Sequence, residues 1–333
     1  MQAVPVSNSA LDALIADDDG VYTLSFLLLP EYAMASLLSA IEPLRIANRL
    51  AGRVLFRWQC LSEAGDAVVA SNGLALQDSM AISPQLKPKN LFVNASFHPE
   101  RYLSDTCVTW LRELNRLGHT IGALDTGCYL LAKAKLLSNS PITLHWEAKP
   151  AFVERYPDLT VSNELFEIHG KRITCAGGTA ATDLMLHLID AYFQSELAVL
   201  VCEQLIKNEA RNHSDNQRIS WSKKLKLHHP KMLKALDLMT ANIEVPISTA
   251  NLADQLAISV RQLERLFQQY LQTSPSNYYL QIRIEHARYL LSDSGLSIAD
   301  IALASGFSST AHFSRRYREF YGTTASQYRS AIK

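Results

Sequence analysis

The order of apolar and polar positions divides the chain into an N-terminal part in which strands alternate with helices and a C-terminal part that is helical throughout. Between residues 21 and 179 the predicted strands are continuous apolar runs, among them YTLSFLLL, VLFRWQCLS, NLFVNAS and TIGALD, and longer amphipathic stretches lie between them. Strands without polar alternation, separated by helices, are typical of a parallel sheet that is covered on both faces. The pattern therefore predicts a doubly wound α/β domain over residues 21–206.

Polar segments mark the limits of this domain. Residues 1–20 carry no strand or helix pattern, and we predict that they form a disordered extension. After a long helical region comes KNEARNHSDNQRIS, which has almost no apolar residues and indicates a linker over residues 207–222. Residues 223–333 consist of helical patterns separated by turn signals such as QTSPSN and YGTTAS. They predict an all-α second domain, and a length of 333 residues suits two domains.

Charge is unevenly distributed between the two parts, although the whole chain has a net charge of zero. Lys and Arg number 18 against 24 Asp and Glu in residues 1–220, and 14 against 8 in residues 221–333. The two parts therefore carry −6 and +6. A basic C-terminal domain indicates an anionic partner, and nucleic acid is the first candidate.

Several classes of protein are disfavoured by what the sequence lacks. The cysteines are scattered and never spaced as CxxC, which argues against a disulfide framework and against a zinc site. No run approaches 18 apolar residues, and the N-terminus has neither the basic start nor the apolar core of a signal peptide. We expect a soluble, cytoplasmic protein without a metal or cofactor and without a membrane partner.

The C-terminal domain contains an internal repeat. Residues 252–283 align with residues 301–329 at an offset of 49, which becomes 50 after one extra residue in the turn. Leu263 then corresponds to Phe313, and Arg265 to Arg315. Each copy has a short helix with a small residue, a tight turn and a second amphipathic helix. This is the helix-turn-helix design, in which the second helix enters the major groove of double-stranded DNA.

The apolar stripe of each second helix predicts which side chains face outward. Leu263, Leu266 and Phe267 form the buried stripe of the first copy, and Phe313, Tyr317 and Phe320 form that of the second. The predicted DNA-facing residues are Arg261, Gln262, Arg265, Gln268, Ser309, Thr310, Arg315 and Arg318. Arg and Gln can pair with guanine and adenine edges, whereas Ser, Thr and peripheral Arg more often hold phosphates. Two such faces in one basic domain favour DNA binding over ordinary solvated helices.

This domain resembles a known family. Residues 229–330, and above all IADIALASGFSSTAHFSRRYREFYG, resemble the DNA-binding domain of the AraC/XylS transcription regulators. The resemblance implies two helix-turn-helix units that read successive major-groove segments, roughly 34 Å apart. One departure is Ala325, where the family usually has proline.

In the N-terminal domain, IGALDTGCYLLAKAKLL predicts a strand that turns sharply into a helix, the kind of corner where α/β enzymes display a nucleophile. This stretch, with FLLLPEY, TLHWEA and TCAGGTAATDLMLHLID, resembles the PfpI-like class I glutamine amidotransferase superfamily. The resemblance implies a flavodoxin-like domain, and the combination of the two domains is similar to the GlxA group of regulators. Asp125 stands where the enzymes have cysteine, Cys128 falls inside the helix, and Ser36 replaces the supporting acid. We therefore predict no catalysis.

The same corner is the predicted ligand site, because ligands of such folds bind at the carboxyl edge of the sheet. Asp125 and Glu42 could face a cationic group, with Trp146 as an aromatic surface for it. The predicted carboxylate-binding groups are Thr126, Asn94, Thr179 and the amides near Gly177 and Gly178, and His145 matches the histidine position of the enzymes. This inventory fits a small zwitterion such as an amino acid, a betaine or carnitine.

The sequence thus predicts a transcription regulator, with activation favoured by family habit, that binds double-stranded DNA and responds to a small effector. We expect a homodimer formed through the N-terminal domain, with the helices in residues 178–207 as the contact, and an activator would also meet RNA polymerase. Two alternatives stay open: a DNA-tethered amidase or hydrolase, and a constitutive DNA binder without a ligand.

Overall fold

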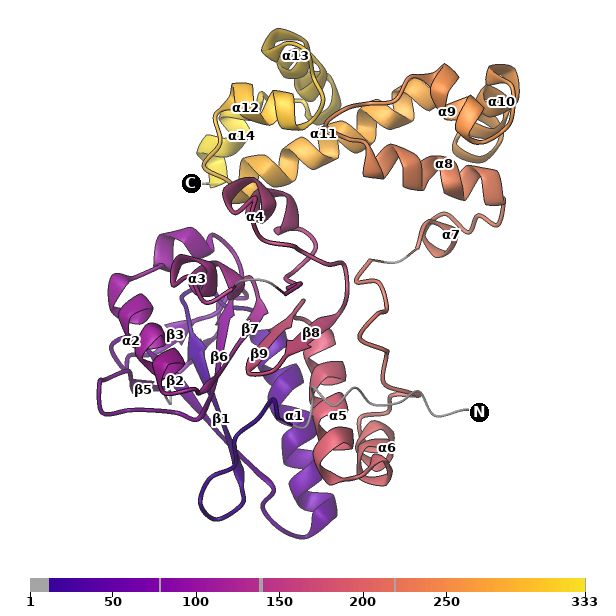
Figure 1. Ribbon diagram of the computed structural model, residues 1–333. Helices are drawn as coiled ribbons and strands as arrows, with labels where there is room; N and C mark the ends of the chain where they lie inside the picture. Colours follow the sequence, from indigo (N-terminus) through magenta and orange to yellow (C-terminus); the bar gives the residue numbers. More distant parts are fainter. Residues whose placement is uncertain (1–11, 78, 138–139, 219, 333) are drawn as a thin grey trace. The chain divides into compact units, whose positions relative to one another are not determined.

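The chain folds into two compact units that meet at the peptide between Gln217 and Arg218. The structure is a computed structural model, and it describes residues 12–77, 79–137, 140–218 and 220–332 (Figure 1). No helix in this described part of the chain is long and apolar enough to cross a membrane.

A central sheet organises the first unit. Within the described residues it has seven strands in the order β5-β2-β1-β6-β7-β9-β8. Their bounds are β1 (Tyr22–Leu28), β2 (Phe56–Ser62), β5 (Ser79–Ala81), β6 (Asn90–Ala95), β7 (Thr120–Asp125), β8 (Phe166–His169) and β9 (Arg172–Cys175). All neighbours pair in parallel except β8, which runs antiparallel to β9. Counted along the chain, the five inner parallel strands follow the flavodoxin-like order 2-1-3-4-5, which confirms the predicted doubly wound sheet.

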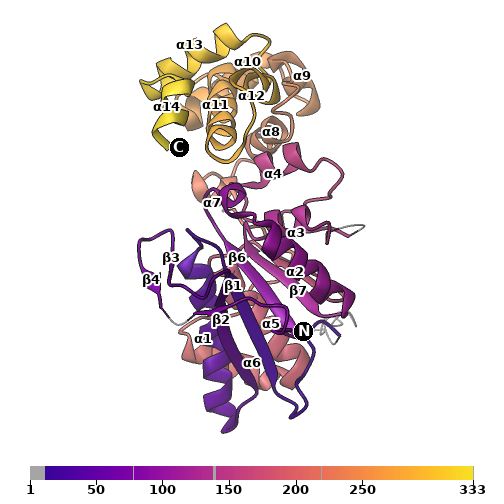
Figure 2. The same ribbon diagram turned by 90° about the vertical axis from the view of Figure 1, so that its left-hand side faces the viewer.

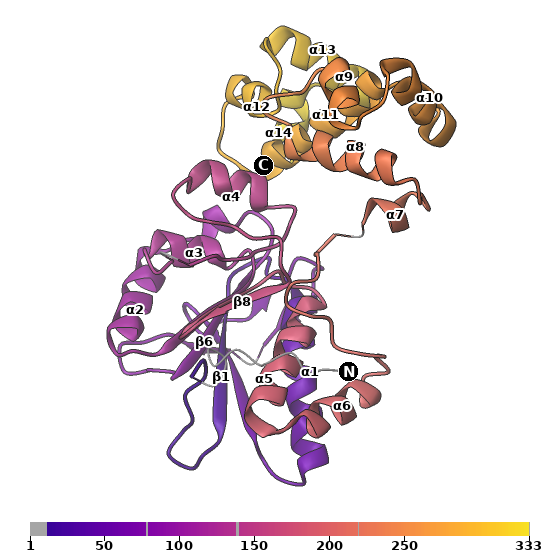
Figure 3. The same cartoon turned by 45° about the vertical axis from the view of Figure 1, so that its right-hand side comes forward.

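Helices cover both faces of this sheet. On one side lie α1 (Met34–Ala51), α5 (Ala180–Phe193) and α6 (Ser195–Gln204), and on the other lie α2 (Asp105–Arg116) and α3 (Cys128–Lys133), as Figures 2 and 3 show. Because successive residues of a strand point to opposite faces, Phe26 belongs to the core under α1 and Leu27 to the core under α2. Both cores are apolar, so the strands are apolar at nearly every position.

Smaller elements complete the unit. They are a ribbon of β3 (Val68–Val69) and β4 (Ala75–Leu76), a 3₁₀ turn at Pro99–Tyr102 and the helix α4 (Lys149–Arg155). None of these was predicted, since short elements carry too few residues for a clear period. The predicted long helical region after residue 178 is divided into α5 and α6 at Gln194, which has a left-handed φ of 97°.

The ends of the first unit differ from the expected boundaries. Of the predicted disordered extension, residues 1–11 lie outside the described residues, but Ala13 and Leu14 are buried in the core. The Leu14 amide donates to the Tyr192 hydroxyl at 2.7 Å, and the Ile15 amide donates to Asn90 Oδ1 at 2.7 Å. The N-terminal segment is therefore part of the fold from residue 13 onward.

The predicted linker is also largely part of the first unit. Residues 207–217, here termed the strap, run beside α5 and belong to this unit. The Arg211 amide donates to Asp183 Oδ1 at 2.9 Å, and the Leu165 amide donates to the His213 carbonyl at 2.8 Å. Polar composition suggested an unstructured segment, whereas the strap is polar because it binds a polar surface.

The second unit is helical, as predicted. Its helices are α7 (Trp221–Lys224), α8 (Pro230–Ala241), α9 (Thr249–Gln255), α10 (Val260–Leu271), α11 (Pro275–Asp293), α12 (Ile298–Ala304), α13 (Thr310–Tyr321) and α14 (Ala325–Ile332). The pairs α9–α10 and α12–α13 form the two helix-turn-helix units. Between them lies α11, whose 19 residues span about 28 Å at 1.5 Å per residue.

The internal repeat of the sequence is also a repeat of backbone geometry. Ser259 caps α10 and Ser309 caps α13, each by accepting a hydrogen bond from the amide three residues later. Within the turns, Ala257 and Gly306 occupy equivalent positions with left-handed φ values of 51° and 73°. At Gly306 a Cβ would lie 2.3 Å from the Ile243 carbonyl oxygen, so glycine is required in the second turn.

His286 of α11 gives the second unit a pH-dependent stability. Its Nδ1 lies 3.4 Å from Ser305 Oγ, and burial lowers the pKa of the imidazole from 6.5 to about 4. Because the unfolded chain binds this proton more tightly, the contribution to stability is full above pH 6.5 and is lost as the pH falls towards 4. The lost free energy of unfolding should reach about 3 kcal/mol. Urea unfolding between pH 7 and 4 should show this loss in the wild type and a smaller loss in His286→Gln; parallel curves would contradict it.

Candidate functional site

The strand β7 ends in a strained turn at Asp125. This residue has a left-handed φ of 59°, which aspartate tolerates better than most residues. The turn is tight: a Cβ on Gly127 would lie 2.2 Å from the Val93 carbonyl oxygen. The Thr126 hydroxyl donates to the Ser96 carbonyl at 2.7 Å and ties the turn to the segment after β6. Asp125 therefore occupies the corner at which related folds display a nucleophile.

Groups from three other segments lie around Asp125, a residue that is only 7% exposed. The Ser36 hydroxyl from the start of α1 donates to Asp125 Oδ2 at 3.4 Å and accepts from the Gly178 amide at 2.6 Å. A Cβ on Gly177 would lie 2.7 Å from the Cβ of Asp125. The His145 amide lies 3.4 Å from the Asp125 carbonyl oxygen, to which it donates. The structure thus brings the predicted Gly178, Thr126 and His145 to one place.

Asn94 lies on β6, beside the end of β7, and Trp146 follows His145 in the chain. The contacts of Asn94 suit a different role from the predicted one. The Asn94 amide group donates to the Ala33 carbonyl at 3.2 Å, and its buried Oδ1 has no hydrogen-bond partner among the described residues. An unpartnered acceptor suits a donor or a cation, so Asn94 fits the cationic end of a ligand rather than the predicted carboxylate end. The rings of His145 and Trp146 lie 5.5 Å apart, and burial lowers the pKa of His145, which keeps the imidazole neutral at pH 7.

Glu42 does not belong to the site. It lies six residues beyond Ser36 on α1, about 9 Å further along the axis and on another side of the helix. Its carboxylate is half exposed and accepts from Arg45 Nη2 at 2.7 Å. Ser36 lies against Asp125, so the helical spacing between Ser36 and Glu42 places Glu42 away from the site. The sequence alone could not show this, because it does not reveal which residue of α1 lies next to the end of β7. Thr179, in contrast, follows Gly178 at the N-terminus of α5, where its side chain is exposed.

Cys128 is a buried structural thiol. Its Sγ donates to the Thr143 carbonyl at 3.3 Å, and the residue has no exposed surface. Burial above all, and then Cys175 and Asp125, raise its pKa, so the thiol stays protonated. A buried, protonated thiol is a poor nucleophile.

Residues of the strap and of α5 reach this site without having been predicted. Arg211 Nη2 donates to the Thr179 hydroxyl at 3.0 Å, and Asp183 of α5 binds Arg211. Gln217 Nε2 donates to the Leu144 carbonyl at 3.0 Å, next to His145. The sequence contains one sign of these contacts. Asp183 is a carboxylate within the apolar run TDLMLHL, and a carboxylate buried there requires a cationic partner elsewhere in the fold.

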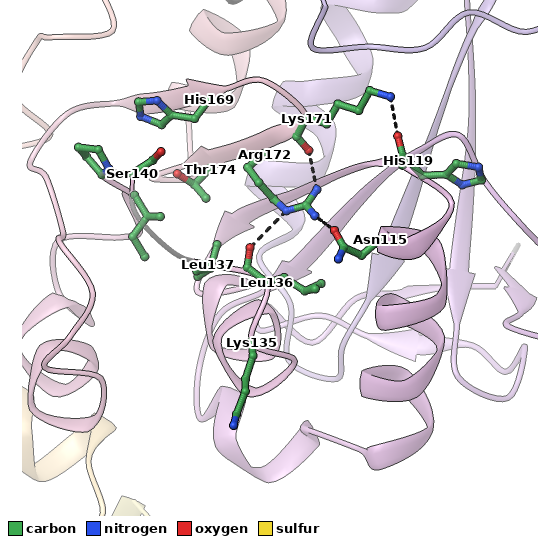
Figure 4. A pocket seen from close by; sticks show the side chains of 13 residues that line it. Asn115, His119, Lys135, Leu136, Leu137, Ser140, His169, Lys171, Arg172 and Thr174 are labelled. Carbon is green, nitrogen blue, oxygen red and sulfur yellow. Dashed lines mark hydrogen bonds between the residues drawn. The ribbon is translucent and has the colours of Figure 1, made fainter.

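A cavity of about 440 Å³ lies elsewhere on the first unit, at the amino ends of β7 and β9. Lys135, Lys171, Arg172, His119 and His169 are among its lining residues (Figure 4). The Arg172 guanidinium donates to the carbonyls of Leu136 and Lys171 and to Asn115. None of the predicted ligand-site residues lines this cavity, which is therefore separate from the Asp125 turn.

On the second unit, the predicted outward face of α10 is present. Leu263 and Phe267 are buried, and Arg261, Arg265 and Gln268 are exposed. Gln262 is exposed too, but its Oε1 accepts from the Ser259 amide at 2.9 Å in a capping box. Its side chain therefore has a structural role that periodicity could not show.

The face of α13 follows the same arrangement. Phe313 and Tyr317 are buried, but Phe320 is 46% exposed, contrary to the predicted stripe, because it lies in the last turn beyond the core. Arg315 lies 4.0 Å from Glu319, and Ser309 is the N-cap. Among the described residues, no ion pair holds Arg265 or Arg318. Ala325 begins α14 as Pro275 begins α11, so the departure from proline leaves the helix in place.

Known proteins resemble this chain both in its DNA-binding unit and over nearly its full length. Residues 252–331 match the family described as "Helix-turn-helix domain". The chain is 44% identical over 307 residues to the HTH-type transcriptional regulator CdhR of Pseudomonas aeruginosa, covering 92% of this chain and 91% of that protein. It is 36% identical over 314 residues to the HTH-type transcriptional regulator GlxA of Rhizobium meliloti, covering 94% and 97%.

A solved structure shows the fold of the first unit. The crystal structure of a THiJ/PfpI family protein from Pseudomonas syringae superposes with a TM-score of 0.50 at 17% identity, covering 77% of this chain and 97% of that one. The family is established by the relatives that match over most of both chains, together with the two helix-turn-helix units. The chain belongs to the AraC family of transcription regulators, in the GlxA-type group, and its first unit has the fold of a PfpI-like protein.

Proposed function

We propose that this regulator is an activator controlled by a small zwitterionic metabolite that binds at the Asp125 turn. The observation that carries the proposal is a carboxylate, 7% exposed, at the position where related enzymes hold a nucleophile. The turn keeps the strained geometry of a catalytic corner, and the nearby thiols of Cys128 and Cys175 are buried and protonated because burial raises their pKa values. Such a corner retains the means to bind a ligand but lacks a group to attack it.

The polar groups around the turn suit a zwitterion. The Asp125 carboxylate and the unpartnered Asn94 Oδ1 favour a cationic group, and the Trp146 ring offers it a π face. The Thr179 hydroxyl and the exposed start of α5 favour a carboxylate, which a helix N-terminus attracts. A quaternary amine such as glycine betaine or carnitine, or an amino acid, combines the two charges.

The regulator is expected to bind neighbouring DNA half-sites as a homodimer, and we assign the contact between its two chains to α6. Most apolar residues of α5 are buried within their own unit, whereas Val199 and Leu200 of α6 are 58% and 41% exposed. A ligand that changes how two sensor units pair would change how their DNA-binding units meet neighbouring half-sites, and an activator would then engage RNA polymerase.

Ligand binding can be tested by thermal unfolding of the full chain against glycine betaine, L-carnitine, L-arginine and choline. A ligand at 100 times its dissociation constant should stabilise the chain by about 2.7 kcal/mol. Asp125→Asn should abolish the shift because it removes the charge that faces the cation. Glu42→Gln is the matched control and should leave it unchanged. No shift with any of these compounds, or a hydrolytic turnover that Cys128→Ser removes, would contradict the proposal.

Sequence-specific DNA contact can be tested at Arg265. Arg265→Ala should cost about 1–3 kcal/mol of binding free energy and relax the preference at one base pair. Gln262→Ala, one helical turn away, should instead lower the melting temperature of the second unit, because its side chain caps α10. Binding to a randomised operator library would separate the two effects. An equal loss on every sequence would make Arg265 a phosphate contact.

The dimer contact can be tested by placing a charge on α6. Val199→Glu should convert a dimer into a monomer in sedimentation velocity, since a carboxylate would be buried in an apolar interface. Val69→Glu, at a valine that is 52% exposed in β3, is the control and should leave the dimer intact. A dimer that persists in Val199→Glu would place the interface elsewhere.

A further inference from the structure

A buried carboxylate holds the strap to the sensor unit. Asp183, in the first turn of α5, has no exposed surface. Its Oδ1 forms an ion pair with Lys207 Nζ at 2.8 Å. Its Oδ2 accepts a hydrogen bond from Arg211 Nε at 2.9 Å and lies 2.7 Å from Arg211 Nη2 in the same ion pair. A carboxylate out of water requires such partners, so the positions of Lys207 and Arg211 are determined by Asp183.

The same arginine reaches the rim of the Asp125 turn. Arg211 Nη2 donates to the hydroxyl of Thr179, and the neighbouring Gly178 amide donates to Ser36, which donates to Asp125. The charges of Asp183, Asp125 and Arg211 all act on the buried thiol of Cys175. Burial raises the pKa of this thiol to about 12, the two carboxylates raise it further, and Arg211 lowers it. Arg211 and Asp125 are therefore connected through one short segment, because Asp125 packs against Gly177 and Arg211 binds Thr179, two residues further along the chain.

We propose that Arg211 is the carboxylate-binding residue of the effector site, an assignment that rests on the function proposed above. The guanidinium uses Nε and Nη2 on Asp183 and Thr179, and Nη1 has no hydrogen-bond partner among the described residues. The side chain is 37% exposed, which leaves it accessible to a ligand. Guanidinium matches the geometry of a carboxylate, and opposite charges at the two ends of the site orient a zwitterion.

Because Arg211 belongs to the strap, this contact also carries the signal. The strap continues to Gln217, whose Nε2 donates to Thr143 Oγ1 at 2.8 Å and to the Leu144 and Glu164 carbonyls. The second unit begins at the next residue. A ligand carboxylate on Arg211 adds a third contact to the network of Asp183 and Thr179 and changes the free energy with which the strap is held. The effector thus acts on the segment that leads directly into the DNA-binding unit.

A purely structural role for Arg211 makes a different prediction from a ligand contact. If Arg211 only anchors the strap, its loss weakens every ligand of the site equally. If Arg211 binds the carboxylate, its loss weakens only ligands that have one. Matched probes separate these cases: glycine betaine and choline share a trimethylammonium group, and L-arginine and agmatine differ by a carboxylate.

Isothermal titration of the full chain with both pairs tests the proposal. The wild type should bind the carboxylate-bearing member of a pair at least about tenfold more tightly, as expected for a charged hydrogen bond. Arg211→Gln should reduce this preference to about onefold and leave the affinity for choline or agmatine within about twofold of the wild type. Arg45→Gln removes an arginine from a half-exposed ion pair on α1, away from the site, and should keep the wild-type preference.

Further outcomes keep the two proposals distinguishable. If Arg211→Gln destabilises the unit by leaving Asp183 with Lys207 alone, the double variant Asp183→Asn/Arg211→Gln also removes the buried carboxylate that has lost a partner, and it should show the same lost preference. Wild-type preference in a folded Arg211 variant would overturn the role of Arg211 while leaving the effector site in place. Failure of the wild type to bind any of the four probes would instead overturn the proposed class of effector, and the role of Arg211 with it.

Discussion

The turn at Asp125 is the constraint on which the arrangement of the first unit depends. A parallel sheet brings the carboxyl ends of its strands to one edge, and β7 lies near its centre, between β6 and β9. At this edge the chain must reverse into α3 within two residues, which is accomplished by a left-handed Asp125 and by a glycine pressed against the Val93 carbonyl. The same geometry that exposes a nucleophile in an enzyme here places a carboxylate at the corner, and this carboxylate is the group that we propose binds the cationic end of the effector.

Charge burial connects this turn to the rest of the chain. Asp183 cannot lie in the core without cationic partners, and the chain supplies them from the polar segment after α6. The strap is thereby joined to the rest of the first unit at one end by Asp183 and at the other by Gln217. A linker of similar composition without these bonds would not couple the DNA-binding unit to the first unit, because its conformation would be independent of the first unit.

The two helix-turn-helix units of the DNA-binding unit are built with the same turn geometry and the same helix capping. Each turn needs a left-handed residue and each second helix needs an N-cap, and the two copies meet both needs at equivalent positions. Arg283 of α11 donates to the carbonyls of Ser305 and Gly306 and lies 4.2 Å from the centre of the Phe307 ring, so the second turn is attached to the helix that joins the copies. The two recognition helices are thus carried by one rigid element.

Much of the architecture was predictable from the sequence by itself. Continuous apolar runs specify strands buried on both faces, because such strands have no solvent-facing side, and the repeat at an offset of 49 to 50 specifies two similar helical units. Phe26 and Leu27 already imply two cores, and TIGALDTG implies the corner at Asp125. These features are local or periodic, and the chain encodes them in adjacent residues.

The membership of the site was decided only by tertiary structure. Glu42 and Asp183 are both single carboxylates in helical sequence, yet one faces solvent beside Arg45 and the other is buried with Lys207 and Arg211. Helical period fixes the side on which a residue lies, but which neighbour covers that side depends on how α1, α5 and the strap pack. Polar residues of the strap are indistinguishable from a linker until their partners in the first unit, which lie 24 to 74 positions away, are in place.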